Sequence, residues 1–76
     1  MSQETMKGYI ARDKNGSISL YECKPKRKQW KSTDYINDVW HPSIGGWIQL
    51  NKSMFPEITW DDEPKEVEIT INLIDK

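Results

Sequence analysis

Residues 9–21 read Tyr-Ile-Ala-Arg-Asp-Lys-Asn-Gly-Ser-Ile-Ser-Leu-Tyr, and this stretch decides the fold. Apolar and polar side chains alternate on both sides of an Asn-Gly pair, a pattern that indicates two strands joined by a tight turn. Glycine adopts a positive φ without steric cost, so the turn is expected at Asn15-Gly16. The sequence therefore predicts an antiparallel β-hairpin.

The length of the hairpin loop determines which side chains share a face of the sheet. A two-residue loop would set Ile10 opposite Tyr21. A three-residue loop, with Gly16 as a left-handed bulge residue, sets Ile10 opposite Leu20 and Tyr9 opposite Tyr21. Because a slip of one residue moves every side chain to the other face, we predict the second register, which separates aliphatic from aromatic side chains.

Further strands are predicted toward the C-terminus. Residues 67–73 alternate strictly between apolar and polar, which is typical of a strand with one buried face. Residues 47–50 read as a short strand. Between these two segments, Asn51 is expected to cap a single helical turn over residues 52–55, and Pro56 is expected to end it.

The middle of the chain leaves two interpretations open. In residues 33–40, the side chains of Tyr35, Ile36, Val39 and Trp40 fall on one helical face. A short helix is one expectation for this segment, and an ordered loop is the other.

These elements predict a mainly β fold, with a three- to four-stranded antiparallel sheet and at most a short helix. The alternative is a closed SH3-like barrel, if residues 26–31 and 58–60 both form strands. A length of 76 residues indicates a single domain, residues 1–76. Residues 1–6 carry no strand signal and are expected to form a disordered tail.

The predicted sheet has two unlike faces. Tyr9, Tyr21 and Trp47 fall on one face, which is either capped by residues 30–44 or left open as a contact surface. The other face is aliphatic, and Met54, Phe55, Ile58 and Trp60 are the nearest candidates to cover it. It would collect Ile10, Ile18, Leu20, Ile48, Leu50, Val67, Ile69, Ile71 and Leu73.

Composition argues against several classes of function. The net charge is −1, which requires neither nucleic acid nor a membrane as partner. Cys23 is the only cysteine, and no secretory signal or run of about 20 apolar residues occurs, so we expect a cytoplasmic protein with no membrane contact. His41 lies before Pro42 without a partner suited to catalysis. The sequence therefore predicts no enzyme, no catalytic residue, no metal and no cofactor.

A basic run is the sharpest local feature of the chain. Clustered cations beside an aromatic ring suit a phosphate backbone with a stacked base. The possible nucleic-acid contacts are Lys24, Lys26, Arg27, Lys28, Trp30 and Lys31.

The aromatic residues support a different hypothesis, because tryptophan and tyrosine dominate protein interfaces. Trp47 and Trp60 lie in strand-like contexts and are expected in the core. The possible protein contacts are Trp30, Tyr35, Trp40, Tyr9 and Tyr21. The leading expectation is thus a non-enzymatic protein-interaction module that binds a host or phage protein or itself, and a nucleic-acid-binding domain is the alternative.

Residues 8–17 (GYIARDKNGS) and 55–68 (FPEITWDDEPKEVE) also carry a resemblance. They resemble a family of small uncharacterised proteins from phages and mobile elements of Bacteroides-type gut bacteria. That family has no assigned activity, so the resemblance transfers no functional residues. It implies an accessory protein of a mobile element or its host, working in a bacterial cytoplasm.

Overall fold

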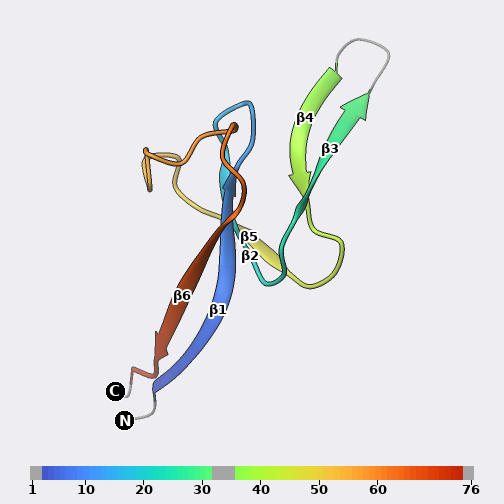
Figure 1. Cartoon of the computed structure of the whole chain (residues 1–76). Helices are drawn as coiled ribbons and strands as arrows, with labels where there is room; N and C mark the ends of the chain where they lie inside the picture. The colour runs from blue at the N-terminus through green and yellow to red at the C-terminus, as the bar shows by residue number, and fades with distance from the viewer. Residues whose placement is uncertain (1–2, 32–35, 75–76) are drawn as a thin grey trace.

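The computed structural model describes residues 3–31 and 36–74, which form six β-strands and no helix. Four strands make one antiparallel sheet in the order β5-β2-β1-β6, and β3 pairs with β4 as a separate ribbon (Figure 1). The mainly β prediction is confirmed, and the sheet does not close into a barrel. The strands are β1 Gln3–Arg12, β2 Ile18–Tyr21, β3 Lys26–Lys31, β4 Ile36–His41, β5 Trp47–Gln49 and β6 Lys65–Asn72.

The hairpin between β1 and β2 has the predicted register. Tyr9 lies opposite Tyr21, and Ile10 lies opposite Leu20. The Gly16 amide donates to the Asp13 carbonyl over 2.9 Å, and Gly16 has a φ of +98°. The left-handed glycine therefore closes the three-residue loop and sorts aliphatic and aromatic side chains onto different faces.

The predicted C-terminal strand is confirmed as β6, but its partner corrects one expectation. β6 pairs with β1 from Gln3 to Ile10, so residues 3–6 belong to a strand and not to a disordered tail. These residues carry no strong strand signal of their own. They are held in register because the eight residues of β6 offer a ladder that is longer than the hairpin.

The helix considered for residues 33–40 is not formed where the structure describes this segment. Ile36–His41 is strand β4, antiparallel to β3, while residues 33–35 lie outside the described part. The spacing of Ile36, Val39 and Trp40 suits a helix, but Trp40 is buried at the sheet. Tertiary contacts of that ring therefore override the local pattern.

The single helical turn expected after Asn51 is a hydrogen-bonded turn instead. The Met54 amide donates to the Asn51 carbonyl over 2.9 Å, and the Ser53 amide donates to the Asn51 side chain over 2.9 Å. Phe55 then has a φ of +51°, which is outside the helical region. Asn51 thus nucleates a turn through its side chain, without continuing into a helix.

Both faces of the sheet carry part of the core, and of the two alternatives for the aromatic face the structure shows the capped one, since Trp40 from residues 30–44 is buried there. On the aliphatic face, Ile10 and Ile18 are buried with Ile58, which comes from the loop between β5 and β6. On the aromatic face, Tyr21 is buried with Trp40 of β4. Of the candidates to cover the aliphatic face, Ile58 does so most completely. Trp60 packs against the opposite face.

Arg12 fastens the covering loop to the end of β1. Its guanidinium donates to the carbonyls of Ile58 at 2.6 Å and Gly16 at 2.6 Å. Three more carbonyls accept from it, those of Met54 at 2.9 Å, Phe55 at 3.1 Å and Lys52 at 3.3 Å. One side chain therefore satisfies backbone acceptors across the whole turn that places Ile58 on the core.

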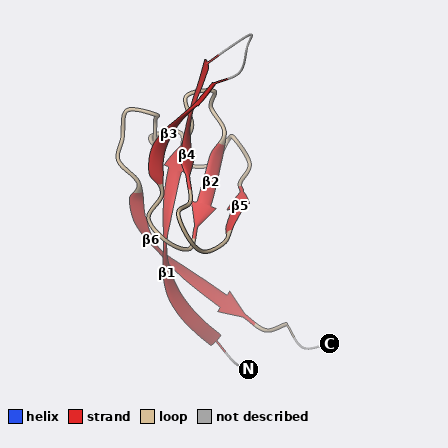
Figure 2. Ribbon diagram, turned by 90° about the vertical axis from the view of Figure 1, so that its right-hand side faces the viewer, coloured by secondary structure: helices blue, strands red, loops and turns tan. Residues whose placement is uncertain are grey.

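Two ribbons project from the sheet. The first, which we call the β1/β6 ribbon, consists of residues 3–8 of β1 and their partners in β6, beyond the reach of β2 (Figure 2). The second is β3 with β4. The molecule is consequently elongated, with extents of 51 × 26 × 24 Å.

Replacement of Arg12 tests the importance of this guanidinium. Arg12→Lys keeps the charge but cannot reach acceptors on both sides of the loop, so we expect a loss of about 2 kcal/mol in the free energy of unfolding by urea titration. Lys7→Met removes only a surface ion pair of 3.6 Å and is expected to change stability by less than about 0.5 kcal/mol. Equal effects of the two substitutions would contradict a special role for Arg12.

Candidate functional site

Two of the residues that the sequence singled out, Arg27 and Trp40, meet at the base of the β3/β4 ribbon. The Arg27 guanidinium lies 4.9 Å from the ring centre of Trp40 and 4.7 Å from that of Trp60. It also donates to the Trp60 carbonyl over 2.9 Å. We call Arg27, Trp40 and Trp60 the arginine–tryptophan cluster. Because both rings offer their negative π-faces to one cation, Arg27 joins β3 to the loop before β6.

Trp40 is fixed at this place by three polar contacts. Its amide donates to the Asp13 carboxylate over 2.9 Å, and its indole N–H donates to the Arg12 carbonyl over 3.0 Å. Its carbonyl accepts from the Tyr21 hydroxyl at 3.4 Å. Every polar group of Trp40 thus has a partner, as a buried tryptophan requires.

This burial corrects the expected protein contacts. Tyr21 is 3% exposed and Trp40 is 5% exposed, so both are core residues that a partner cannot reach. Tyr9 is half-buried and packs against the same aromatic core. Trp30 belongs to β3, opposite Asn37, and Tyr35 lies outside the described residues. Among the side chains that the structure describes, Tyr9, Tyr21 and Trp40 therefore belong to the aromatic core and not to an open contact surface.

Burial also alters the acidity of two groups in this core. Desolvation raises the pKa of Asp13 above its ordinary value, and the hydrogen bond from the Trp40 amide partly opposes that rise. Desolvation likewise raises the pKa of Tyr21, and the nearby Asp13 charge adds to the rise. Asp13 thus holds Trp40 in place although burial disfavours its ionised form.

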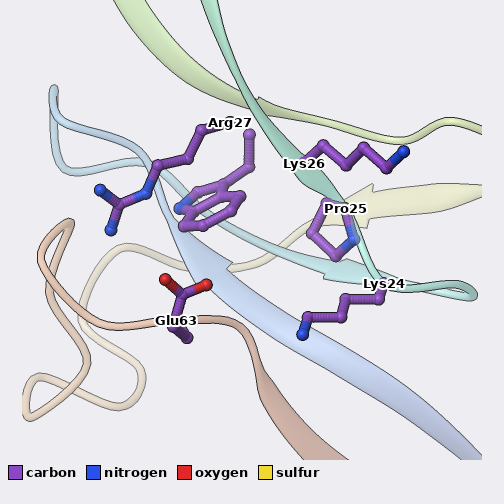
Figure 3. Close-up of a pocket in the computed structure, with 6 residues that line it drawn as sticks. Lys24, Pro25, Lys26, Arg27 and Glu63 are labelled. Atoms are coloured by element: carbon purple, nitrogen blue, oxygen red, sulfur yellow. The ribbon is translucent and has the colours of Figure 1, made fainter.

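A hollow of about 460 Å³ opens beside the arginine–tryptophan cluster. Pro25 and Trp40 supply apolar surface. The Glu63 carboxylate faces the hollow from the loop before β6, while the Lys24 ammonium lies on the other side (Figure 3). Apolar surface with opposite charges at the rim can hold a small amphipathic group. Among its lining residues, Lys24, Pro25, Lys26, Arg27, Trp40 and Glu63, no nucleophile lies beside a base that would activate it.

The basic run does not form one continuous patch. Lys26 pairs with His41 and Lys28 pairs with Val39 on one face of the ribbon, because residues two apart share a face. Arg27 and Lys31 belong to the other face, where Arg27 is occupied by the tryptophan rings. Lys24 precedes β3 and borders the hollow. The alternation of side chains along β3 therefore divides the cations of this strand between the two faces of the ribbon.

A surface that sequence reasoning missed lies on the β1/β6 ribbon. Met6 is directly opposite Ile69, and Ile71 follows on the same face of β6. Met6 is 44% exposed, Ile71 is 50% exposed, and Ile69 is partly exposed. We call these three residues the apolar ribbon face. It continues the aliphatic core face beyond the loop that carries Ile58, and the exposed Leu73 follows it along the chain.

Gly8 makes this face continuous with the core. A Cβ on Gly8 would lie 2.8 Å from the Ile69 Cδ1 and 3.0 Å from the Tyr21 carbonyl oxygen. The missing side chain therefore lets Ile69 lie across β1 toward Leu20. The alternation of residues 67–73 signals the apolar row, but its exposure depends on how far the covering loop reaches.

The edge strand β5 forms where residues 47–50 predict a short strand, but the exposure of its side chains differs from expectation. Trp47 was expected in the core, but it is 54% exposed and stacks on Tyr21 with ring centres 6.3 Å apart. Its neighbour Ile48 is 58% exposed on the aliphatic side. Both residues are only half covered because β5 is the outermost strand of the sheet.

Comparisons with known proteins identify no relative: no family model, no curated protein and no solved structure matches the chain. Within residues 3–31 and 36–74, no group of three or more His, Cys, Asp or Glu side chains is placed to hold a metal ion. The same described residues contain no helix with the length and apolarity that crossing a membrane requires.

The environment of Asp13 generates a pH-dependent prediction. A folded-state pKa above the unfolded value of 3.8 means that Asp13 contributes stability below that pH and loses this contribution as pH rises through the folded-state pKa. Asp13→Asn stays neutral and keeps an acceptor for the Trp40 amide. The unfolding free energy of the variant minus that of the wild type should therefore increase as pH rises above 3.8, and level off once pH exceeds the folded-state pKa of Asp13. Urea titrations at fixed temperature measure this difference, and a flat or falling difference would contradict the assignment.

Proposed function

We propose that this chain is a non-enzymatic protein-interaction module whose contact surface is the apolar ribbon face. The exposure of Met6, Ile69 and Ile71 in one row supports this proposal. Contiguous apolar surface that remains after folding is typical of a binding site, since isolated exposed hydrophobic residues are common but rows of them are not.

The setting of the row also supports a binding role. Lys7, Glu68 and Thr70 occupy the opposite face of the ribbon, so the apolar side chains lie on one side only. The register with β1 fixes their spacing before any partner arrives. Preorganised side chains lose little conformational entropy on binding. Complete burial of one isoleucine side chain contributes about 1.5–3 kcal/mol, and the half of Ile71 that is still exposed can contribute part of this on binding.

The proposal includes a cytoplasmic setting. The resemblance of the two terminal segments to proteins of phages and mobile elements supports an accessory role, and the partner then comes from the element, from its host or from the chain itself. This part rests on the resemblance and on the single cysteine alone.

A matched pair of charge substitutions tests the contact surface. Ile71 of β6 and Thr5 of β1 have side chains on opposite faces of the ribbon. Ile71→Glu places a charge on the apolar ribbon face and should weaken partner binding at least tenfold, because a carboxylate would be desolvated at the contact. Thr5→Glu adds the same charge on the polar face and should retain the partner.

Quantitative pull-downs with the wild type and both variants measure the effect, supported by light scattering for self-association. Proteins that the wild type and Thr5→Glu retain but Ile71→Glu loses are the expected partners. Equal retention by both variants would contradict this contact surface. A wild type that remains monomeric and retains nothing would contradict the interaction module itself.

Nucleic-acid binding is a second candidate because the β3/β4 ribbon projects from the sheet (Figure 1). One of its faces carries Lys26 and Lys28, together with His41. The major groove of DNA admits a two-stranded β-ribbon, and lysines on such a ribbon suit phosphate contacts. Engagement of Arg27 with two tryptophan rings leaves this candidate with fewer cations than the sequence suggested.

Fluorescence anisotropy with labelled oligonucleotides separates the second candidate from the first. If the ribbon binds nucleic acid, the double substitution Lys26→Glu, Lys28→Glu should lower affinity and reduce the slope of log K against log salt by about 1.8. Lys52→Glu, in the loop on the other side of the molecule, is the control. Absence of wild-type binding at about 50 mM salt would remove this candidate.

A further inference from the structure

We infer that the partner of the β1/β6 ribbon is a second copy of this chain, which pairs antiparallel along the outer edge of β6. The inference rests on the proposed role of the ribbon as a contact surface and names the partner. β6 is the last strand of its sheet, so its outer edge has no neighbouring strand among the described residues. At eight residues, it is longer than the outermost strand on the other side, β5, with three.

The direction of the backbone groups on β6 follows from the hairpin turn. The Asp13 amide donates to the Ser17 carbonyl, so the backbone N–H and C=O groups of Asp13 point toward β2. This direction alternates along a strand, so the odd-numbered residues of β1 point these groups toward β2 and the even-numbered residues point them toward β6. The residues of β1 whose backbone groups bond to β6 are therefore Glu4, Met6, Gly8, Ile10 and Arg12. Two bonds from β2 to the β5 side agree with this alternation, because Ile18 accepts from Leu50 and Glu22 donates to Gly46.

The register with β1 extends this alternation to β6. Met6 lies opposite Ile69 and Gly8 lies opposite Val67, so the odd-numbered residues of β6 bond inward. The even-numbered residues direct their N–H and C=O groups to the free edge. These residues are Glu66, Glu68, Thr70 and Asn72. The outer edge thus offers a regular row of donors and acceptors to another strand.

The sequence of β6 selects one register for pairing with itself. A two-fold axis at Ile69 sets Glu68 opposite the second copy's Thr70 and Glu66 opposite the second copy's Asn72. Both pairs join residues whose backbone groups face the edge, and neither joins like charges. On the other face, Val67 then lies opposite the second copy's Ile71.

Other registers are less favourable. An axis at Glu68 would place this carboxylate opposite its own copy, which is a repulsive pair. An axis at Thr70 would shorten the overlap, because β6 ends at Asn72. A shift by one residue would set apolar side chains opposite polar ones. Charge, length and alternation therefore agree on the axis at Ile69.

This pairing also brings apolar side chains into cross-strand contact along the joint, Ile69 with its own copy and Val67 with Ile71. The two copies would form one continuous sheet, in which both rows of Met6, Ile69 and Ile71 lie side by side on the same face. On the polar face, Lys7 lies 3.6 Å from Glu66 and offsets part of the acidic charge beside the joint. An edge with unpaired backbone groups and apolar side chains on one face is a template for strand addition.

Two proline substitutions test the inference against a matched control. Thr5 and Thr70 lie directly opposite each other in the ribbon, but their amides face opposite edges. Thr70→Pro removes a donor from the outer edge of β6 and blocks the approach of a second strand, whereas Thr5→Pro does the same at the free edge of β1. Neither substitution removes a bond between β1 and β6.

Light scattering after size exclusion measures the outcome. The wild type and Thr5→Pro should show twice the chain mass of 9.0 kDa, and Thr70→Pro should show the chain mass. Loss of the dimer in Thr5→Pro alone, or in neither variant, would overturn pairing through β6. A wild type that remains monomeric at its highest soluble concentration would overturn the second copy as partner. If the wild type is monomeric but retains another protein that Ile71→Glu loses, the interaction module is still supported and only the second copy is ruled out as partner.

Hydrogen exchange of the wild type keeps the inference testable if a proline variant fails to fold. The amides of Glu68 and Thr70 should be protected at high protein concentration and exchange rapidly after dilution. The amides of Thr5 and Lys7, at the other edge, should exchange rapidly at both concentrations. Equal protection of the two pairs of amides, or no dependence on concentration, would overturn the edge pairing.

Discussion

Arg12 forms hydrogen bonds on both faces of the sheet, through its side chain on one face and through its carbonyl on the other. Alternation along β1 places the Arg12 side chain on the aliphatic face beside Ile10, where its guanidinium gathers the carbonyls of the loop that carries Ile58. Its own carbonyl accepts the indole N–H of Trp40, which lies on the aromatic face. Asp13, the next residue, accepts the Trp40 amide and begins the hairpin turn. Two adjacent residues therefore tie the hairpin, the covering loop and the second ribbon together, so a short chain can cover both faces of one sheet.

The parts of the fold that the sequence predicts are those set by neighbouring residues. Asn15-Gly16 determines the turn, and alternation on both sides of it determines the register, so the two unlike faces follow from residues 9–21 alone. β6 is equally evident, because strict alternation over seven residues suits a strand and no other element. Its pairing with residues 3–6 was not predictable, since the polar start of β1 shows no pattern until β6 supplies a partner.

The candidate site depends on contacts between distant residues, and the sequence predicted less of it. The Asp13 to Trp40 bond joins positions 27 residues apart, and the Arg27 to Trp60 bond joins positions 33 apart. Neither leaves a local signal, so Ile36, Val39 and Trp40 were interpreted by their helical spacing. The sequence identified Arg27 and Trp40 as important residues, but it assigned them to open surfaces. The structure uses both residues to attach the β3/β4 ribbon to the sheet.

The β1/β6 ribbon is costly for an isolated small domain. Two strands alone are marginal in water, and this pair leaves both of its edges and one apolar face uncovered. Gly8 increases that cost, because it removes a side chain from the strand and lowers its propensity while it brings Ile69 to the end of the core. A chain that needed only to fold would end its strands where β2 ends. Extending them with an ordered apolar row, in fixed register, is consistent with a ribbon that is completed by another strand.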